Sequence, residues 1–107
     1  MSQEFIYILR PTRPEMLSKG PTSHESEVVG RHFQYLKGLC DDGIVLTAGR
    51  TLTDDERTLG LVIFRAANQE AADSLVAADP AVLEGVMSAE VIPFRVALLS
   101  DCWAIVE

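Results

Sequence analysis

The sequence predicts an α+β fold with the element order βαββαβ, in which a four-stranded antiparallel sheet carries two helices on one face. Short apolar runs of β-type residues alternate with two segments of helical periodicity, and each helical segment follows a good capping residue. The chain has 107 residues, and its apolar fraction of 48% is ordinary for a globular protein. This length suits one domain with a single core.

The first strand is expected from Phe5 to Leu9, where apolar and β-type residues form a short run. Pro11 and Pro14 end the strand, because proline has no N–H group to donate to a neighbouring strand. A polar loop from Arg10 to Gly20 then leads to the first helix.

The first helix is expected to begin after Thr22, whose side chain can cap it while Glu25 completes a capping box. It runs to about Asp42, and Gly43 supplies a left-handed residue at its end. Apolar residues recur along it with a period near 3.6 and should face the core. These positions are Val28, Val29, Phe33, Leu36, Leu39 and Cys40.

The second half of the chain repeats the alternation of strands and helices. Strands are expected at Ile44 to Ala48 and at Leu59 to Ala66, separated by a charged loop from Thr51 to Thr58 that should lie in solvent. Asn68 is a good cap for a second helix from Gln69 to Ala78.

An Asp-Pro step follows the second helix. Asp79 can cap a further helical turn with Pro80 at its first position, and Gly85 ends that turn. The fourth strand is expected from Glu90 to Leu99, and Pro93 within it indicates a sheet edge or a bulge. The resulting order is the ferredoxin-like arrangement.

The charge balance argues against several classes of partner. Nine basic and sixteen acidic residues give a formal net charge of −7, so nucleic acid is not expected as a partner. No apolar run approaches the roughly 20 residues that span a bilayer, and the first residues lack the features of a signal peptide. We therefore expect a cytoplasmic protein with no membrane partner, in which Cys40 and Cys102 are reduced thiols.

No cofactor or metal is expected. The sequence contains neither a glycine-rich dinucleotide fingerprint nor a phosphate loop. His24 and His32 lie eight positions apart, which places them about 12 Å apart along a continuous helix. Two ligands of one zinc ion each lie only about 2 Å from the metal, so these histidines cannot share an ion. His24, in the first turn, is expected to be solvated.

His32 and Asp79 each have a functional and a purely structural interpretation. His32 falls at the margin of the predicted buried stripe, where an imidazole is partly desolvated and sensitive to its neighbours. It can also be explained as a core histidine bonded to a backbone carbonyl, and the residues alone favour that interpretation. Asp79 is fully explained as a helix cap.

Three motifs together resemble the YciI-like, or YCII-related, family of the dimeric α/β barrel superfamily. They are the run from His32 to Leu39, the Asp79-Pro80 step, and the run from Val91 to Phe94. The resemblance extends over most of the chain, so residues 1–100 are assigned to one such domain and residues 101–107 to a C-terminal tail. It implies that His32 and Asp79 form a catalytic pair.

The resemblance also implies a small-molecule-binding protein. If the protein is an enzyme, we expect cofactor-free proton transfer of the lyase, isomerase or dehydrochlorinase type on a small cyclic or aromatic metabolite. His32 would be the base or acid, and Asp79 would orient it. The alternative is a non-catalytic homodimer that binds a metabolite or acts as an accessory protein. The absence of an obvious nucleophile favours that alternative.

Arg50 and Tyr35 are candidate substrate-binding residues. Arg50 stands where many family members have proline, and an arginine at a strand end can bind a carboxylate through two hydrogen bonds. It is alternatively a surface charge paired with Asp54 or Asp55. Tyr35 follows His32 by three positions and therefore lies near it on the helix, where it either contacts a ligand or anchors the helix.

A homodimer is the expected assembly. Alternating apolar residues such as Ile6, Ile8, Val45 and Val62 cannot all face the helices, and an uncovered apolar face is unfavourable for a monomer. A second copy packed sheet to sheet would cover that face, as the resemblance implies. The apolar tail, 101–107, either adds a strand to a partner's sheet or covers its own subunit's core.

Overall fold

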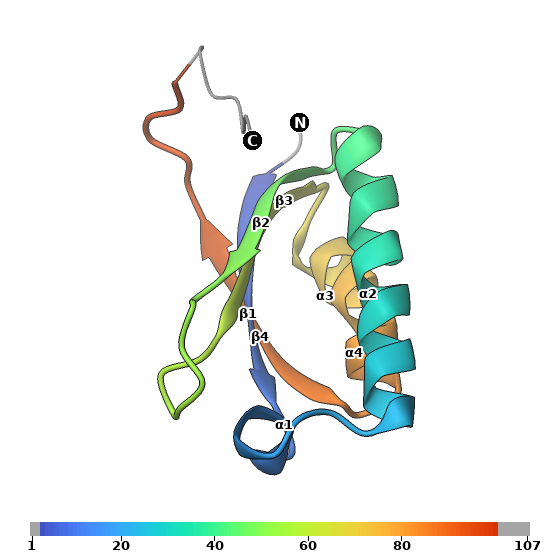
Figure 1. Ribbon diagram of the computed structural model, residues 1–107. Coiled ribbons are helices and arrows are strands. Elements are labelled where there is room, and N and C mark those ends of the chain that lie inside the picture. The colour runs from blue at the N-terminus through green and yellow to red at the C-terminus, as the bar shows by residue number, and fades with distance from the viewer. Residues whose placement is uncertain (1–2, 101–107) are drawn as a thin grey trace.

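The computed structural model describes residues 3–100 of the chain and shows the predicted α+β fold (Figure 1). Two short helices, α1 and α4, accompany the two main ones. The elements are β1 Gln3–Pro11, α1 Glu15–Ser18, α2 Ser23–Asp41, β2 Val45–Arg50, β3 Gly60–Ala66, α3 Gln69–Ala77, α4 Pro80–Leu83 and β4 Met87–Phe94. Both predicted roles of the tail 101–107, and the thiol of Cys102, fall outside the described residues.

The four strands form one antiparallel sheet in the order β2-β3-β1-β4, which is the ferredoxin-like order. Helices α2, α3 and α4 lie on one side of this sheet (Figure 1). Tyr7, at the centre of β1, pairs with Val62 on one side and Val91 on the other. Strand β4 lies at an edge, which confirms the position predicted from Pro93.

The predicted helix ends are confirmed by their capping contacts. The Glu25 backbone N–H donates to the Thr22 hydroxyl at 3.1 Å, and the Thr22 N–H donates to the Glu25 carboxylate at 2.8 Å. Gly43 has a φ of 77°, a left-handed conformation that ends α2. Asn68 caps α3 by accepting a 2.8 Å bond from the Ala71 N–H.

Several predicted strand boundaries differ from the structure because strand pairing sets them. Strand β1 runs from Gln3 to Pro11 rather than from Phe5 to Leu9, and β2 runs from Val45 to Arg50 rather than from Ile44 to Ala48. The fourth strand ends at Phe94 rather than Leu99, and its last pairing at this end is with Glu4, near the beginning of β1. Strand β4 instead begins earlier, at Met87, which pairs with Pro11. The predicted polar loop after β1 contains the short helix α1.

The buried stripe of α2 is narrower than predicted. Phe33 is 61% exposed and Cys40 is also exposed, although both were assigned to the core face. Helix α2 is buried along a line that passes through Val28, which packs with Ala81 and Val86, and Leu36, which packs in the core beneath the sheet. Phe33 lies about 100° around the helix from the residue before it and points away from that line.

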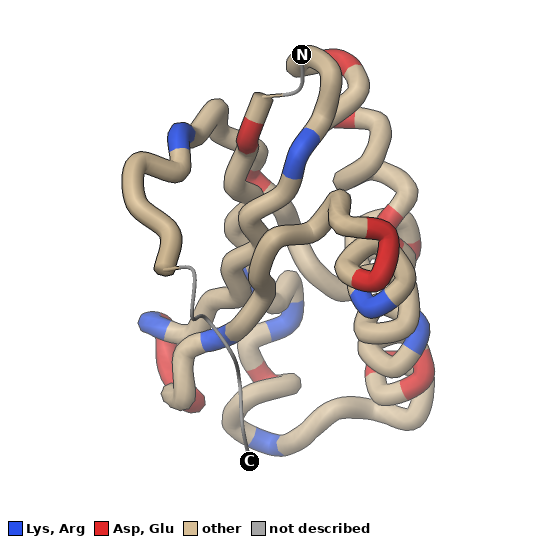
Figure 2. Tube along the Cα trace, turned by 90° about the horizontal axis from the view of Figure 1, so that it is seen from above, with Lys and Arg blue, Asp and Glu red and all other residues tan. Residues whose placement is uncertain are grey.

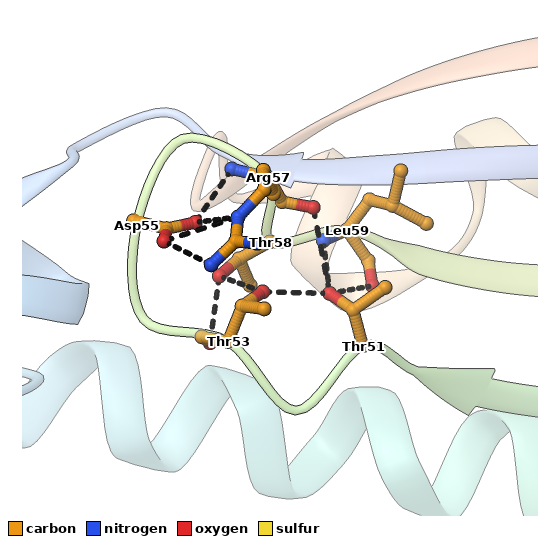
Figure 3. A network of polar contacts seen from close by, with 6 residues as sticks. All are labelled: Thr51, Thr53, Asp55, Arg57, Thr58 and Leu59. Carbon is orange, nitrogen blue, oxygen red and sulfur yellow. Dashed lines mark hydrogen bonds and ion pairs between the residues drawn. The ribbon is translucent and has the colours of Figure 1, made fainter.

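The charged loop between β2 and β3 is folded on itself rather than simply solvated (Figure 3). The hydroxyls of Thr51, Thr53 and Thr58 bond to one another or to loop carbonyls, and Thr58 is buried. Asp55 pairs with Arg57 at 2.7 Å. The predicted solvent exposure of this loop is therefore wrong at Thr58, because the three hydroxyls bond within the loop.

The face of the sheet opposite the helices carries an apolar cluster, and the same strand register also places Glu4, Arg65 and Glu90 on this face. Strand register places six large apolar side chains on it, and we call this set the open face. Its members are Ile6, Ile8, Leu61, Ile63, Ile92 and Phe94. Leu61, Ile92 and Phe94 are 38%, 37% and 41% exposed. Val45 and Val62, by contrast, are buried towards the helices. Charged residues lie mainly on the helices and loops (Figure 2).

Candidate functional site

His32 lies at the middle of α2, one turn after Val28 and one turn before Leu36. Both neighbours are buried, so the imidazole faces the interior, and its side chain is 13% exposed. His32 is thus only partly buried between two buried residues, which agrees with the partial desolvation predicted for it.

Asp79 begins α4 and is fully buried. Its carboxylate oxygen Oδ1 accepts a 2.9 Å hydrogen bond from the Ala81 N–H, and Pro80 occupies the first turn of the helix. The predicted capping role is confirmed. Gly85, with a φ of 73°, follows the end of this short helix as predicted.

The structure brings His32 and Asp79 into direct contact. The Nδ1 atom of His32 lies 2.8 Å from Oδ1 and 2.8 Å from Oδ2 of Asp79, across 47 positions of sequence. An ionised carboxylate can only accept hydrogen bonds, so Nδ1 carries the proton in this arrangement. The other ring nitrogen, Nε2, makes no hydrogen bond within residues 3–100 and is the atom that can exchange a proton with a ligand.

Tyr7 is a third member of this cluster, and the sequence reasoning missed it. Its hydroxyl donates a 2.8 Å bond to Oδ2 of Asp79, and both side chains are fully buried. Burial and the nearby charge of Asp79 raise the pKa of Tyr7 well above its usual value. The alternation of β1 indicated this orientation, because Tyr7 lies between Phe5 and Leu9 on the buried face.

Tyr35 anchors α2 to α3. Its hydroxyl donates a 2.7 Å hydrogen bond to the carbonyl oxygen of Leu75. Burial, and to a lesser extent the charge of Asp79, raise the pKa of Tyr35. This contact is the one expected of an anchoring residue, whereas ligand binding by Tyr35 stays a prediction.

Arg50 stands apart from the His32–Asp79 contact. It is exposed at the end of β2, opposite Gly60, and its side chain makes no hydrogen bond or ion pair among the described residues. The alternative that it pairs with Asp54 or Asp55 is not supported, since Asp55 binds Arg57. Arg50 lines an open concavity of about 320 Å³ formed by residues of β2, β3 and their connection. Its predicted role in substrate binding stays a prediction.

The residues that could bind a metal are dispersed. Within residues 3–100, no three His, Cys, Asp or Glu side chains gather as a possible metal site. Nε2 of His24 lies 3.8 Å from a carboxylate oxygen of Glu84 on the surface. The other histidine of the chain is His32, further along the same helix. In this part of the chain there is also no helix long and apolar enough to cross a membrane.

The chain belongs to the YCII-related family, whose domain profile matches residues 5–95. Its structure is similar to that of 5-chloro-2-hydroxyhydroquinone dehydrochlorinase from Burkholderia phenoliruptrix in complex with 2,5-dihydroxybenzoquinone. That match has a TM-score of 0.61 and 22% identity, and it covers 85% of this chain and 93% of the other. At this identity the likeness concerns the fold. No curated protein sequence matched the chain.

Proposed function

We propose that this protein is a cofactor-free enzyme that moves a proton on a small cyclic or aromatic metabolite. His32 is the base or acid, and Asp79 orients it. The observation that carries this proposal is a fully buried carboxylate with both oxygens 2.8 Å from the same imidazole nitrogen. A carboxylate so placed fixes the tautomer of the imidazole and stabilises its protonated form.

The chemistry follows from the tautomer. With the proton of the neutral ring on Nδ1, the lone pair of Nε2 accepts a proton from a C–H or O–H bond of the substrate. The electron pair of that bond passes into the conjugated system of the substrate. It then either expels a leaving group such as chloride or accepts the proton back at another atom. The first outcome is an elimination and the second is an isomerisation.

The structural neighbour supports this reaction class but not a particular substrate. Its name describes a dehydrochlorinase, and its bound molecule is a dihydroxylated quinone. Loss of hydrogen chloride requires one proton transfer and one departing chloride, and needs no redox cofactor. The substrate proposed for this chain is accordingly a ring compound with an acidic proton next to a conjugated carbonyl.

We also propose that the protein is a homodimer formed through the open face. Six large apolar side chains on one side of a sheet give a continuous surface of the kind that usually marks an interaction site. A second copy presents the same apolar face, so two sheets packed together remove both from water.

A non-catalytic metabolite-binding protein is the second candidate function. It is favoured by the complete structural explanation of Asp79, whose bond from the Ala81 N–H makes it a helix cap without any role in chemistry. In this case the imidazole would only contribute a polar contact to a bound metabolite.

Hydrogen–deuterium exchange separates the two candidates. The ring protons of 2,5-dihydroxybenzoquinone and of chlorinated hydroxyquinones would be followed by NMR in deuterated water. We expect the wild-type protein to accelerate their exchange, His32→Asn to abolish the acceleration, and His24→Asn to retain it. Equal exchange rates with wild type and His32→Asn for every compound would refute the catalytic proposal. Saturable shifts of the His32 signals without exchange would instead support metabolite binding.

A further inference from the structure

The phenol of Tyr7 occupies a position where a hydroxyl is costly. Its ring is fully buried and meets the Phe64 ring edge-on at 5.5 Å, and the adjoining residue on this face, Phe5, is also an apolar aromatic. Phenylalanine would fill such a site without a polar atom to desolvate. Among the described residues, the hydroxyl makes one hydrogen bond, to Oδ2 of Asp79.

The Asp79 carboxylate receives three donors, and they differ in kind. The Ala81 N–H belongs to the first turn of α4, so its bond is explained by capping. The Nδ1 of His32 belongs to the group that exchanges protons. The Tyr7 hydroxyl comes from β1 and caps no helix, and its proton stays in place because burial and Asp79 raise its pKa. It is therefore a permanent donor to a carboxylate that already accepts the capping bond from the Ala81 N–H.

We propose that Tyr7 is a positioning residue that holds the Asp79 carboxylate and sets the basicity of His32 through it. This inference rests on the proposed function, because it takes the His32–Asp79 pair as the proton-transfer group. Its physical basis is competition for one negative charge. The more fully the carboxylate is satisfied by the Tyr7 hydroxyl, the less it stabilises a positive imidazolium beside it.

The competition gives the effect a definite sign. Without the Tyr7 hydroxyl, a buried carboxylate loses a neutral donor and is stabilised more strongly by a protonated His32. The titration midpoint of His32 should therefore move to higher pH in Tyr7→Phe. Removing the negative charge, in Asp79→Asn, should move it to lower pH. A tyrosine that merely fills space would leave the midpoint unchanged.

Tyr35 is another titratable group near the pair. Tyr35 on α2 feels the charge of Asp79, but its hydroxyl is bound to the Leu75 carbonyl. Tyr35→Phe therefore removes a buried phenol from the same region without removing a donor from Asp79. It is the matched control for the loss of a tyrosine hydroxyl.

The experiment is an NMR titration of the histidine ring protons in the full-length protein. His24, which is exposed, serves as the internal reference, and His32→Gln assigns the His32 signals. We expect the His32 midpoint to rise by about 0.5 to 1 pH unit in Tyr7→Phe. It should fall in Asp79→Asn and remain unchanged in Tyr35→Phe. An independent variant carries 3-fluorotyrosine at position 7, whose more acidic phenol is a stronger donor, and should lower the midpoint.

The outcomes distinguish this inference from the proposed function. If Asp79→Asn lowers the midpoint while Tyr7→Phe leaves it unchanged, the pair stands and the role of Tyr7 is refuted. If neither substitution moves the midpoint, the pair itself fails, and the catalytic proposal fails with it. Should Tyr7→Phe not fold, the 3-fluorotyrosine protein decides the question, because a midpoint equal to that of wild type overturns the inference.

Discussion

The imidazole of His32 and the carboxylate of Asp79 lie in contact because two helices of different parts of the chain meet there. Helix α2 carries His32 near its middle, and Asp79 is the N-cap of α4, where it accepts a hydrogen bond from Tyr7 of the central strand β1. Nδ1 of His32 lies 2.8 Å from both carboxylate oxygens. Asp79 thus contributes to the fold as a cap and to the site as a charge, and these two contributions can be separated experimentally.

Asp79→Asn should separate them. The amide oxygen can still accept the Ala81 N–H bond, so capping is retained, whereas the negative charge beside His32 is lost. The unfolding free energy should fall less than in Asp79→Ala, where loss of the cap alone costs about 0.5–2 kcal/mol. Urea denaturation of both variants measures this order. Equal losses would mean that the charge, and not the cap, dominates the stabilising effect of Asp79.

Local sequence signals predicted the parts of the fold that depend on local contacts. The Thr22–Glu25 capping box and the left-handed Gly43 each involve neighbouring residues, and both are present. The end of β4 and the exposure of Phe33 depend instead on which distant elements pair or pack. Periodicity alone could not give them, because it identifies an apolar face but not how much of that face a partner covers.

The candidate site was less accessible to sequence reasoning. His32 and Asp79 each have a sufficient structural explanation alone, and it was the family resemblance that paired them. Their contact depends on the packing of α2 against α4, and no local sequence pattern predicts that packing. Tyr7 was overlooked because it was counted as one of the apolar residues of a strand. The available signal was the hydroxyl of Tyr7 on the buried face of that strand, because a buried tyrosine hydroxyl usually has a hydrogen-bond partner.

Glu25 should make the stability of the protein depend on pH in acid. Two hydrogen bonds from Arg13, at 2.6 and 2.8 Å, and further bonds from Thr22 lower the pKa of Glu25 from 4.5 to about 2. Since the folded pKa is the lower one, this stabilisation is complete above pH 4.5 and is lost as the pH falls towards 2. Urea midpoints between pH 2 and 6 measure it.

Glu25→Gln is the control for this acid dependence, because glutamine keeps the shape of the side chain and does not titrate. The slope of stability against pH should be reduced in that variant. An unchanged slope would assign the acid dependence to other carboxylates and would show that the Arg13 contacts do not persist in solution.

Two glycines of the α2 region should respond oppositely to alanine. Gly30 lies within α2 with open space where a Cβ would stand, so Gly30→Ala should stabilise the protein by roughly 0.5–1 kcal/mol. Gly43 has a φ of 77°, so Gly43→Ala should destabilise it by about 1–2 kcal/mol. Thermal unfolding of the two variants tests this, and shifts of the same sign would contradict the assigned backbone of α2 and its end.

The open face predicts the assembly state. Ile92 lies on it, paired with Ile6 of the central strand, and is 37% exposed. Light scattering at micromolar concentration should give the mass of a dimer for the wild type and of a monomer for Ile92→Asp. A carboxylate placed between two apolar sheets would be buried without a partner, which opposes association.

Leu83→Asp is the matched control for this substitution. Leu83 is 71% exposed on α4, in the helix layer on the other side of the sheet, so a charge there should leave the dimer intact. If both variants are monomeric, the dimer does not depend specifically on the open face. If the wild type is itself monomeric at this concentration, sheet-to-sheet assembly is wrong, and the six apolar side chains of the open face must have some other partner or remain in water.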